Sequence, residues 1–127
     1  MPIKTLYDNE SGLVQTTCSG KISYTDLSNY QKSVWLEPDV TGFNEIIDFS
    51  EADLSEISFS DLISLAENTP KVFALSLHSK LALITKTDHQ KQLIEFYISV
   101  NTLAETPARS IKNFDSLNNA LSWLSEN

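Results

Sequence analysis

IIDFSEADLSEISFSDL, residues 46–62, contains the change from strand to helix on which the fold depends. The consecutive isoleucines lie in the run FNEIIDF at 43–49 and indicate a strand buried on both faces, as in the centre of a sheet covered by helices. An amphipathic stripe follows, made of Phe59, Leu62, Ile63 and Ala66. Ser58, with Asp61 three residues later, is a variant of the capping box and predicts a helix start there.

The segments on either side alternate between strand and helix patterns. Strands are predicted at 43–49, 79–86 and 108–114, and a hairpin is predicted from 3–9 and 13–19. Further helices are predicted at 25–36 from Thr25 as N-cap, at 88–104 from Asp88, and at 115–126 from Asp115. The order β-β-α-β-α-β-α-β-α predicts an α/β fold with a mostly parallel sheet and an antiparallel hairpin at its start.

Length and charge limit the function classes. We expect one domain over residues 1–127. The net charge of −8 argues against sequence-independent nucleic-acid binding and against electrostatic capture by anionic lipids, but not against apolar contact. With no signal-peptide pattern, no membrane-span pattern and only Cys18 as a thiol, we expect a cytoplasmic protein. In its strand pattern Cys18 shares a face with Val14 and Thr16, which predicts a buried thiol rather than a nucleophile.

Patterns of catalysis and cofactor binding are missing from the sequence. The three glycines, Gly12, Gly20 and Gly42, are too far apart to form a phosphate-binding loop. His78 and His89 lack zinc-ligand spacing, and the acidic loop at 51–56 lacks calcium-loop spacing. There is no G-x-S-x-G elbow. The prediction is a non-enzymatic protein without metal or cofactor.

A family resemblance covers nearly the whole chain in element order. IIDFSEADLSEISFSDLISLA at 46–66 is similar to the strand, loop and helix of STAS domains, the anti-sigma-factor antagonist family. ARSIKNFDSLNNALSWL at 108–124 resembles the closing strand and helix of the SpoIIAA-like subgroup, and SKLALIT at 79–85 resembles its fourth strand. The subgroup's terminal pattern is matched by Phe114, Ala120, Trp123 and Leu124. The resemblance implies a single SpoIIAA-like domain with a five-stranded mixed sheet, four or five helices packed on it, and no catalytic machinery.

The antagonist family also implies a phosphorylation switch, and here the sequence departs from it. Antagonists carry a phosphorylatable serine in an Asp-Ser-(Ser/Thr)-Gly turn, whereas this chain has EISFSD at 56–61, without the glycine or the Asp-Ser pair. Helix capping therefore explains Ser58 best. The alternative is a protein-partner module of the antagonist type. It would use the face from Asp48, at a strand's carboxyl end, to Ser58 and Ser60 as phosphate acceptors.

Apolar residues exceed what the predicted core needs in two places. In TPKVFALSLH at 69–78, Thr69 and Pro70 suggest a helix start, with an extended connector as the alternative. The surplus residues are Val72, Phe73, Leu75 and Leu77 in this segment, Ile94 and Ile98 beside the inner stripe of 88–104, and Trp35 on the flank of 25–36. On a helix, the four in 69–78 would spread around the whole circumference.

Three explanations for this surplus stay open: cover by neighbouring elements, a partner or homodimer interface, or a flap over an apolar cavity. The subgroup's more distant likeness to the CRAL-TRIO lipid-transfer fold favours the flap. The sequence therefore predicts a binding or regulatory module for an apolar, lipid-like small ligand, with peripheral contact at the inner face of the membrane.

Overall fold

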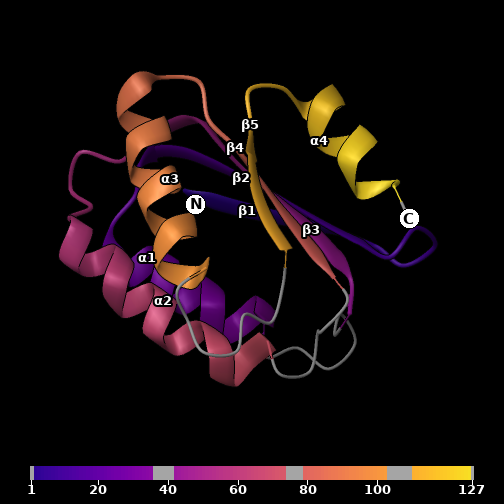
Figure 1. Cartoon of the computed structure of the whole chain (residues 1–127), viewed down its shortest axis with the longest axis horizontal. Coiled ribbons are helices and arrows are strands. Elements are labelled where there is room, and N and C mark those ends of the chain that lie inside the picture. The colour runs from indigo at the N-terminus through magenta and orange to yellow at the C-terminus, as the bar shows by residue number, and fades with distance from the viewer. Residues whose placement is uncertain (1, 36–41, 74–78, 103–109, 127) are drawn as a thin grey trace.

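Strands and helices alternate along the chain in the predicted order (Figure 1). The computed structural model describes residues 2–35, 42–73, 79–102 and 110–126, without the side chains of residues 35, 68–73 and 102. The strands are β1 (Ile3–Asp8), β2 (Leu13–Lys21), β3 (Asn44–Asp53), β4 (Lys80–Ile84) and β5 (Ser110–Phe114). The helices are α1 (Tyr24–Tyr30), α2 (Phe59–Phe73), α3 (Asp88–Thr102) and α4 (Leu117–Leu124), with a π-helical turn, η1 (Gln31–Trp35), directly after α1.

The five strands form one mixed sheet in the order β1-β2-β3-β4-β5. β1 and β2 are antiparallel and the remaining pairs are parallel, which confirms the predicted hairpin and parallel sheet. Each parallel strand lies beside its predecessor, and such crossovers are right-handed, so α1, α2 and α3 all cover the same face of the sheet. α4 follows the last strand and covers the other face, as Figure 1 shows.

Strand alternation divides the buried side chains between these two faces. On β3, Ile47 and Phe49 belong to the main core beneath α1–α3, whereas Ile46 belongs to a smaller core beneath α4. Ala120 of α4 is fully buried in the smaller core, where its small side chain lets the helix approach the sheet. Lys80 Nζ donates hydrogen bonds to the carbonyls of Trp123 at 2.9 Å and Glu126 at 2.7 Å, which holds the end of α4 against β4.

The capping box predicted at Ser58 is confirmed. Asp61 N donates to Ser58 Oγ, and Ser58 N donates to Asp61 Oδ2, both at 3.0 Å. α2 then runs unbroken from Phe59 to Phe73, so the predicted helix start at Thr69 and Pro70 is wrong. A proline inside a helix removes one hydrogen bond, and here α2 continues past that loss while packed along α3.

Three other predicted N-caps are wrong by one or two residues. Ser23, not Thr25, caps α1: Asp26 N donates to Ser23 Oγ at 3.1 Å. Thr87, not Asp88, accepts from Gln90 N at 3.1 Å at the start of α3. In both cases the side chain three residues after the cap accepts a hydrogen bond from the backbone N of the cap residue, which completes a capping box.

At the last helix Ser116 takes the place predicted for Asp115. Ser116 Oγ accepts from Asn119 N at 3.2 Å, while Asp115 Oδ1 accepts from the Asn119 side chain at 3.3 Å. Both residue types are good N-caps, so the choice depends on where the strand before them ends. β5 ends at Phe114, which leaves room for both residues ahead of Leu117.

Candidate functional site

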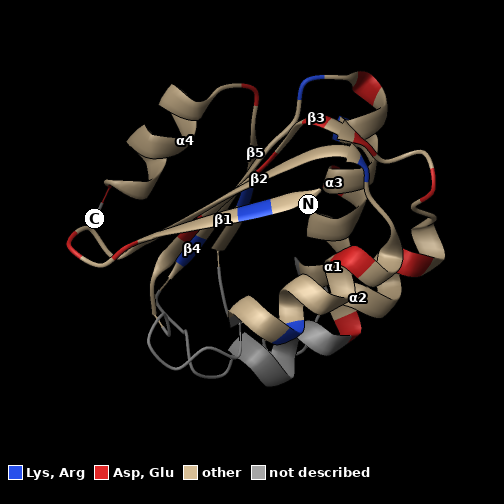
Figure 2. Ribbon diagram, turned by 180° about the vertical axis from the view of Figure 1, so that it is seen from behind, with Lys and Arg blue, Asp and Glu red and all other residues tan. Residues whose placement is uncertain are grey.

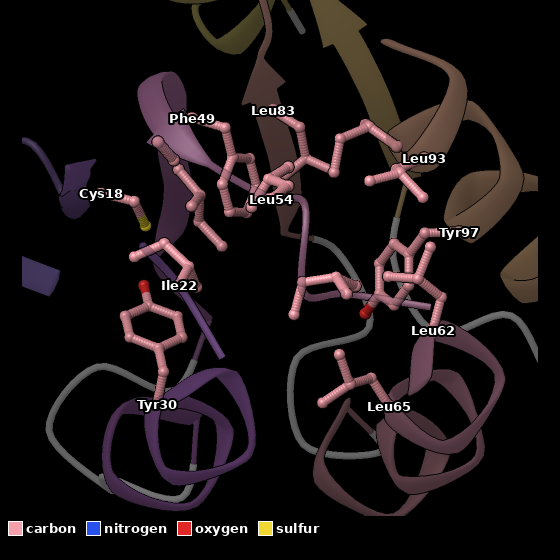
Figure 3. Close-up of a cluster of buried hydrophobic side chains, with 14 of the residues drawn as sticks. Cys18, Ile22, Tyr30, Phe49, Leu54, Leu62, Leu65, Leu83, Leu93 and Tyr97 are labelled. Carbon is pink, nitrogen blue, oxygen red and sulfur yellow. The ribbon is translucent and has the colours of Figure 1, made fainter. Parts of the chain in front are cut away.

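An apolar cavity of about 50 Å³ lies between the main face of the sheet and α1–α3. Its walls are formed by β3 and β4, by α1, η1, α2 and α3, and by the segment between β3 and α2. The lining residues are Leu27, Tyr30, Gln31, Ile47, Phe49, Leu54, Ile57, Leu62, Leu65, Leu81, Leu83, Leu93, Ile94 and Tyr97. Figure 3 shows Phe49 and Leu83 of the sheet above, Tyr30 of α1 on one side, and Leu62, Leu65 and Tyr97 on the other.

The seam between α1 and α2 is joined less tightly than the seam between α2 and α3. α2 packs extensively against α3, whereas its contacts with α1 are sparse. Gln31 bridges the seam, since its buried side-chain Nε2 donates to Leu65 O at 3.1 Å. Gln31 is also the first residue of the π-helical turn η1, and π-turns within helices are frequent at functional sites. The Gln31–Leu65 hydrogen bond therefore spans this side of the cavity at a helical irregularity.

A buried polar chain runs from β1 through β2 and α1 to β3. Thr5 Oγ1 lies 3.1 Å from Thr16 Oγ1, which lies 2.7 Å from the Tyr30 hydroxyl, and that hydroxyl donates to Glu45 Oε2. Burial, and then the Glu45 carboxylate, raise the pKa of the Tyr30 hydroxyl well above its usual value. Because the Tyr30 proton is directed to Glu45, Thr16 must donate to Tyr30 and Thr5 to Thr16.

Sequence reasoning missed Glu45, although the signal was present. Glu45 is 2% exposed and lies on the same face of β3 as Ile47 and Phe49. Alternation along FNEIIDF places it there. Tyr30 of α1 supplies the hydroxyl for this carboxylate. The chain also reaches the surface, because Thr5 and Tyr30 line a groove of about 260 Å³ between β1 and α1.

The structure describes the side chains of only some of the apolar residues that were predicted to be surplus. Ile94 is 4% exposed and lines the cavity, and Ile98 packs partly buried against the same core, so neither is surplus. The inner stripe of α3 is wider than predicted because the helix contacts both α2 and β5. Leu75 and Leu77 lie outside the described residues, as do the side chains of Trp35, Val72 and Phe73.

Exposed apolar surface is found instead at the start of α2. Phe59 is 53% exposed and Ile63 is 40% exposed, although the stripe at 59–66 was predicted to face inward. Leu62 and Ala66 do face the core, so the stripe is wider than the face that the sheet can bury. The Phe59 and Phe96 rings lie 4.7 Å apart, and Phe96 is partly buried. We call Phe59, Ile63 and Phe96 the α2–α3 patch.

The structure does not bring the predicted partner residues together. Asp48 pairs with Ile84 at the end of the β3–β4 ladder, although β3 itself continues to Asp53. Its Oδ1 accepts from Ser50 N at 2.8 Å, and alternation places it on the α4 face. Ser58 and Ser60 are exposed at the start of α2, on the opposite face.

Ligation of metal and thiol chemistry are not favoured by the described residues. Among them, no group of three or more His, Cys, Asp or Glu side chains is arranged to hold a metal ion. Burial, and then the carboxylates of Asp48 and Asp26, raise the pKa of the Cys18 thiol to about 12, which agrees with the predicted buried cysteine. Within the same ranges, no helix combines the length and apolar character that crossing a bilayer needs.

Comparison with known proteins identifies the fold. No protein-family model matches the chain, and no curated protein matches its sequence. A solved structure from Shewanella loihica PV-4, an uncharacterized protein from the DUF3478 family with a SpoIIAA-like fold, has a TM-score of 0.56 and 18% sequence identity. The match covers 96% of this chain and 91% of that one. The chain therefore has the SpoIIAA-like α/β fold predicted from its sequence.

Proposed function

We propose that this protein is a non-enzymatic binding or regulatory module whose ligand is an apolar, lipid-like small molecule held in the cavity beneath α1–α3. The cavity itself is the observation that carries the proposal. Protein interiors are close-packed, with few voids larger than a water molecule. A void with almost wholly apolar walls gives water too few hydrogen-bond partners, so an apolar group is the better occupant.

The size of the cavity means that the ligand enters by moving a helix. At about 50 Å³ it has roughly a third of the ~150 Å³ volume known to hold benzene. The seam between α1 and α2 is the place to expand, because its contacts are fewer than those between α2 and α3 and a hydrogen bond from Gln31 to Leu65 O spans it. A bond of this kind contributes only about 1 kcal/mol net to stability. Ligand contacts along the parted helices offset that loss.

Peripheral membrane contact belongs to the same proposal. The α2–α3 patch gives the protein exposed aromatic and aliphatic side chains on the helical layer that also encloses the cavity. A lipid-like ligand taken from the inner face of the membrane would then have a short path to the seam. The net charge of −8 makes this contact apolar rather than electrostatic.

A cavity-filling variant tests the ligand. Native mass spectrometry of the gently purified protein detects a retained ligand, and titration with dodecanoic acid or dodecanol measures uptake of a defined probe. Leu65→Phe fills the cavity with an apolar ring, so uptake is lost while the thermal midpoint stays equal or rises. Ile63→Phe, on the exposed side of the same helix, is the matched control and retains uptake. Wild-type protein that takes up neither probe contradicts the proposal, as does equal uptake by Leu65→Phe.

A second candidate function is a protein-partner module of the antagonist type. It is favoured by the exposed aromatic ring of Phe59, a residue type enriched at partner interfaces, beside the exposed phosphate-acceptor candidates Ser58 and Ser60. Once a partner is purified, Phe59→Asp and Ser58→Asp should each weaken its binding while dodecanoic acid uptake is unchanged. Partner binding that survives both substitutions excludes this surface.

A further inference from the structure

β1 is an edge strand with a defined set of outward-facing backbone groups. It pairs with β2 on one side and has no strand of the described sheet on the other (Figure 2). Ser19 N donates to Pro2 O at 2.8 Å. Directly opposed residues of an antiparallel pair alternate between bonded and non-bonded pairs, so the even-numbered residues of β1 turn their backbone groups toward β2. Ile3, Thr5 and Tyr7 therefore turn theirs toward the open edge.

The side chains of β1 have a symmetric charge pattern on the α4 face. Lys4, Leu6 and Asp8 share that face, opposite Thr17, Gln15 and Leu13 of β2. Leu6 is 61% exposed, more than the other large apolar side chains that the structure describes. The lysine and the aspartate lie two residues to either side of it. An exposed edge with a central leucine is a template for pairing with another strand.

We propose that β1 pairs with β1 of a second copy of this chain, antiparallel and about a two-fold axis at Leu6. In this register Leu6 faces the partner's Leu6, and Lys4 faces the partner's Asp8 on each side of the axis. In this register Thr5 lies opposite the partner's Tyr7, which is a hydrogen-bonded position of the antiparallel ladder. Asp8 is held in place at the end of β1, because its Oδ1 accepts from Glu10 N at 3.1 Å and from Ser11 N at 3.4 Å, and its carboxylate also bonds the Ser11 side chain.

Neighbouring registers lose the Leu6–Leu6 contact and the two Lys4–Asp8 pairs. Sliding the strands so that Thr5 faces the partner's Thr5 keeps the backbone bonds but places Lys4 against the partner's Leu6, and both charge pairs are lost. The proposed register is self-complementary, as an isologous two-fold interface requires. It joins two five-stranded sheets into one, with α1–α3 of both copies on the same side. The recognition mode is addition of a strand to a sheet edge.

Disulfide trapping tests the register. Opposed residues of a non-bonded antiparallel pair have Cα atoms about 4.5 Å apart, within the range that a disulfide bridges. Leu6→Cys should give a covalent dimer under mild oxidation, read by non-reducing electrophoresis and intact mass. Lys4→Cys is the control, because the two copies of residue 4 would lie roughly 13 Å apart. Native Cys18 does not compete, since it is buried. No dimer from Leu6→Cys, or as much from Lys4→Cys, overturns the proposal.

A charge swap tests the ion pairs by sedimentation velocity. Lys4→Glu should raise the dimer dissociation constant about tenfold or more, and adding Asp8→Lys to it should restore most of the affinity. Leu121→Lys, an exposed apolar position on α4, is the control and leaves dimerisation unchanged. A wild-type chain that stays monomeric at ~100 μM overturns the proposal. So does a dimer that Lys4→Glu leaves intact, since Lys4 would then not contact an acidic residue across the edge.

Discussion

Glu45 lies on the core face of β3, where an ionised carboxylate is costly unless it is hydrogen-bonded. Tyr30 supplies that bond, and Thr16 supports Tyr30 from β2. The chain joins the hairpin, α1 and β3 through Thr16, Tyr30 and Glu45, which are all buried. A satisfied polar chain of this kind specifies one arrangement of the elements that it joins, because each member must meet the next.

Tyr30→Phe should destabilise the protein by about 1–3 kcal/mol, since it leaves Glu45 and Thr16 without the hydroxyl that joins them. Urea unfolding at neutral pH measures the change. Tyr24→Phe, on a partly buried tyrosine at the start of the same helix, is the matched control and should cost less. Equal losses for the two variants would mean that the buried chain adds nothing to stability.

Cys18 should make the fold sensitive to alkali. Burial first, and then Asp48 and Asp26, raise the pKa of its thiol from 9.0 to about 12 in the folded protein. The folded state therefore keeps a proton that the unfolded state releases above about pH 9, so stability is fully present below that pH and falls as pH rises toward 12. The slope is about 1.4 kcal/mol per pH unit at most.

The measurement is the free energy of unfolding at several pH values between 8 and 10.5, compared with Cys18→Ala. The alanine variant has a lower stability at pH 8, because it leaves a small void, but a shallower decline above pH 9. The two proteins are compared by the slope of the free energy of unfolding against pH, not by its absolute value. Parallel declines for the two proteins would show that the thiol is not the responsible group. Burial, and then Glu45, also raise the pKa of Tyr30, so it adds to the decline above about pH 10, but equally in both proteins.

At the scale of elements, the positions of strands were more predictable than the ends of helices. Strands were predicted from apolar runs such as FNEIIDF. A strand is longer than predicted where a neighbouring strand pairs with the additional residues: β3 continues to Asp53 because β2 pairs with it as far as Lys21. Where two polar residues lie close together, the helix starts at the one whose side chain accepts from the backbone N three residues later. Ser58 and Asp61 matched that requirement, whereas the single-residue choice of Thr25 did not.

Substitutions at Ser58 distinguish its role as a helix cap from its candidate role as a phosphate acceptor. Ser58→Ala should cost about 1 kcal/mol of stability, because Asp61 N loses its acceptor. Ser58→Asp should be close to neutral, since aspartate is an equally good N-cap, and Ser60→Ala should also be close to neutral on its exposed site. Thermal unfolding of the three variants makes the comparison. A Ser58→Ala protein as stable as the wild type contradicts the capping role.

At the scale of the whole molecule, the sheet order follows from the alternation of elements and the right-handed crossover. The cavity could not be predicted in the same way. It arises where fourteen side chains from strands, helices and a connecting segment fail to fill one space, and no local pattern encodes that volume. The α2–α3 patch has a similar origin, because the stripe at 59–66 is wider than the surface available to cover it.

The patch and the net charge together predict how the protein meets a membrane. Burying the exposed parts of Phe59 and Ile63 contributes about 2 kcal/mol, which supports weak and reversible contact. The charge of −8 is repelled by anionic headgroups, so binding should be stronger on phosphatidylcholine vesicles than on vesicles containing phosphatidylserine. Added salt should narrow this difference by screening the repulsion.

Vesicle flotation of the wild type, Phe59→Asp and Leu117→Asp decides the matter. Phe59→Asp should abolish flotation, because a carboxylate at the centre of the patch opposes transfer into an apolar phase. Leu117→Asp changes an exposed apolar residue on α4, across the sheet from the patch, and should float like the wild type. A wild type that fails to float on either lipid, or a Phe59→Asp protein that floats equally well, leaves the patch without a role in membrane contact. Dodecanoic acid uptake does not depend on that result, since the site proposed for it is the cavity beneath α1–α3 and not the outer surface of α2.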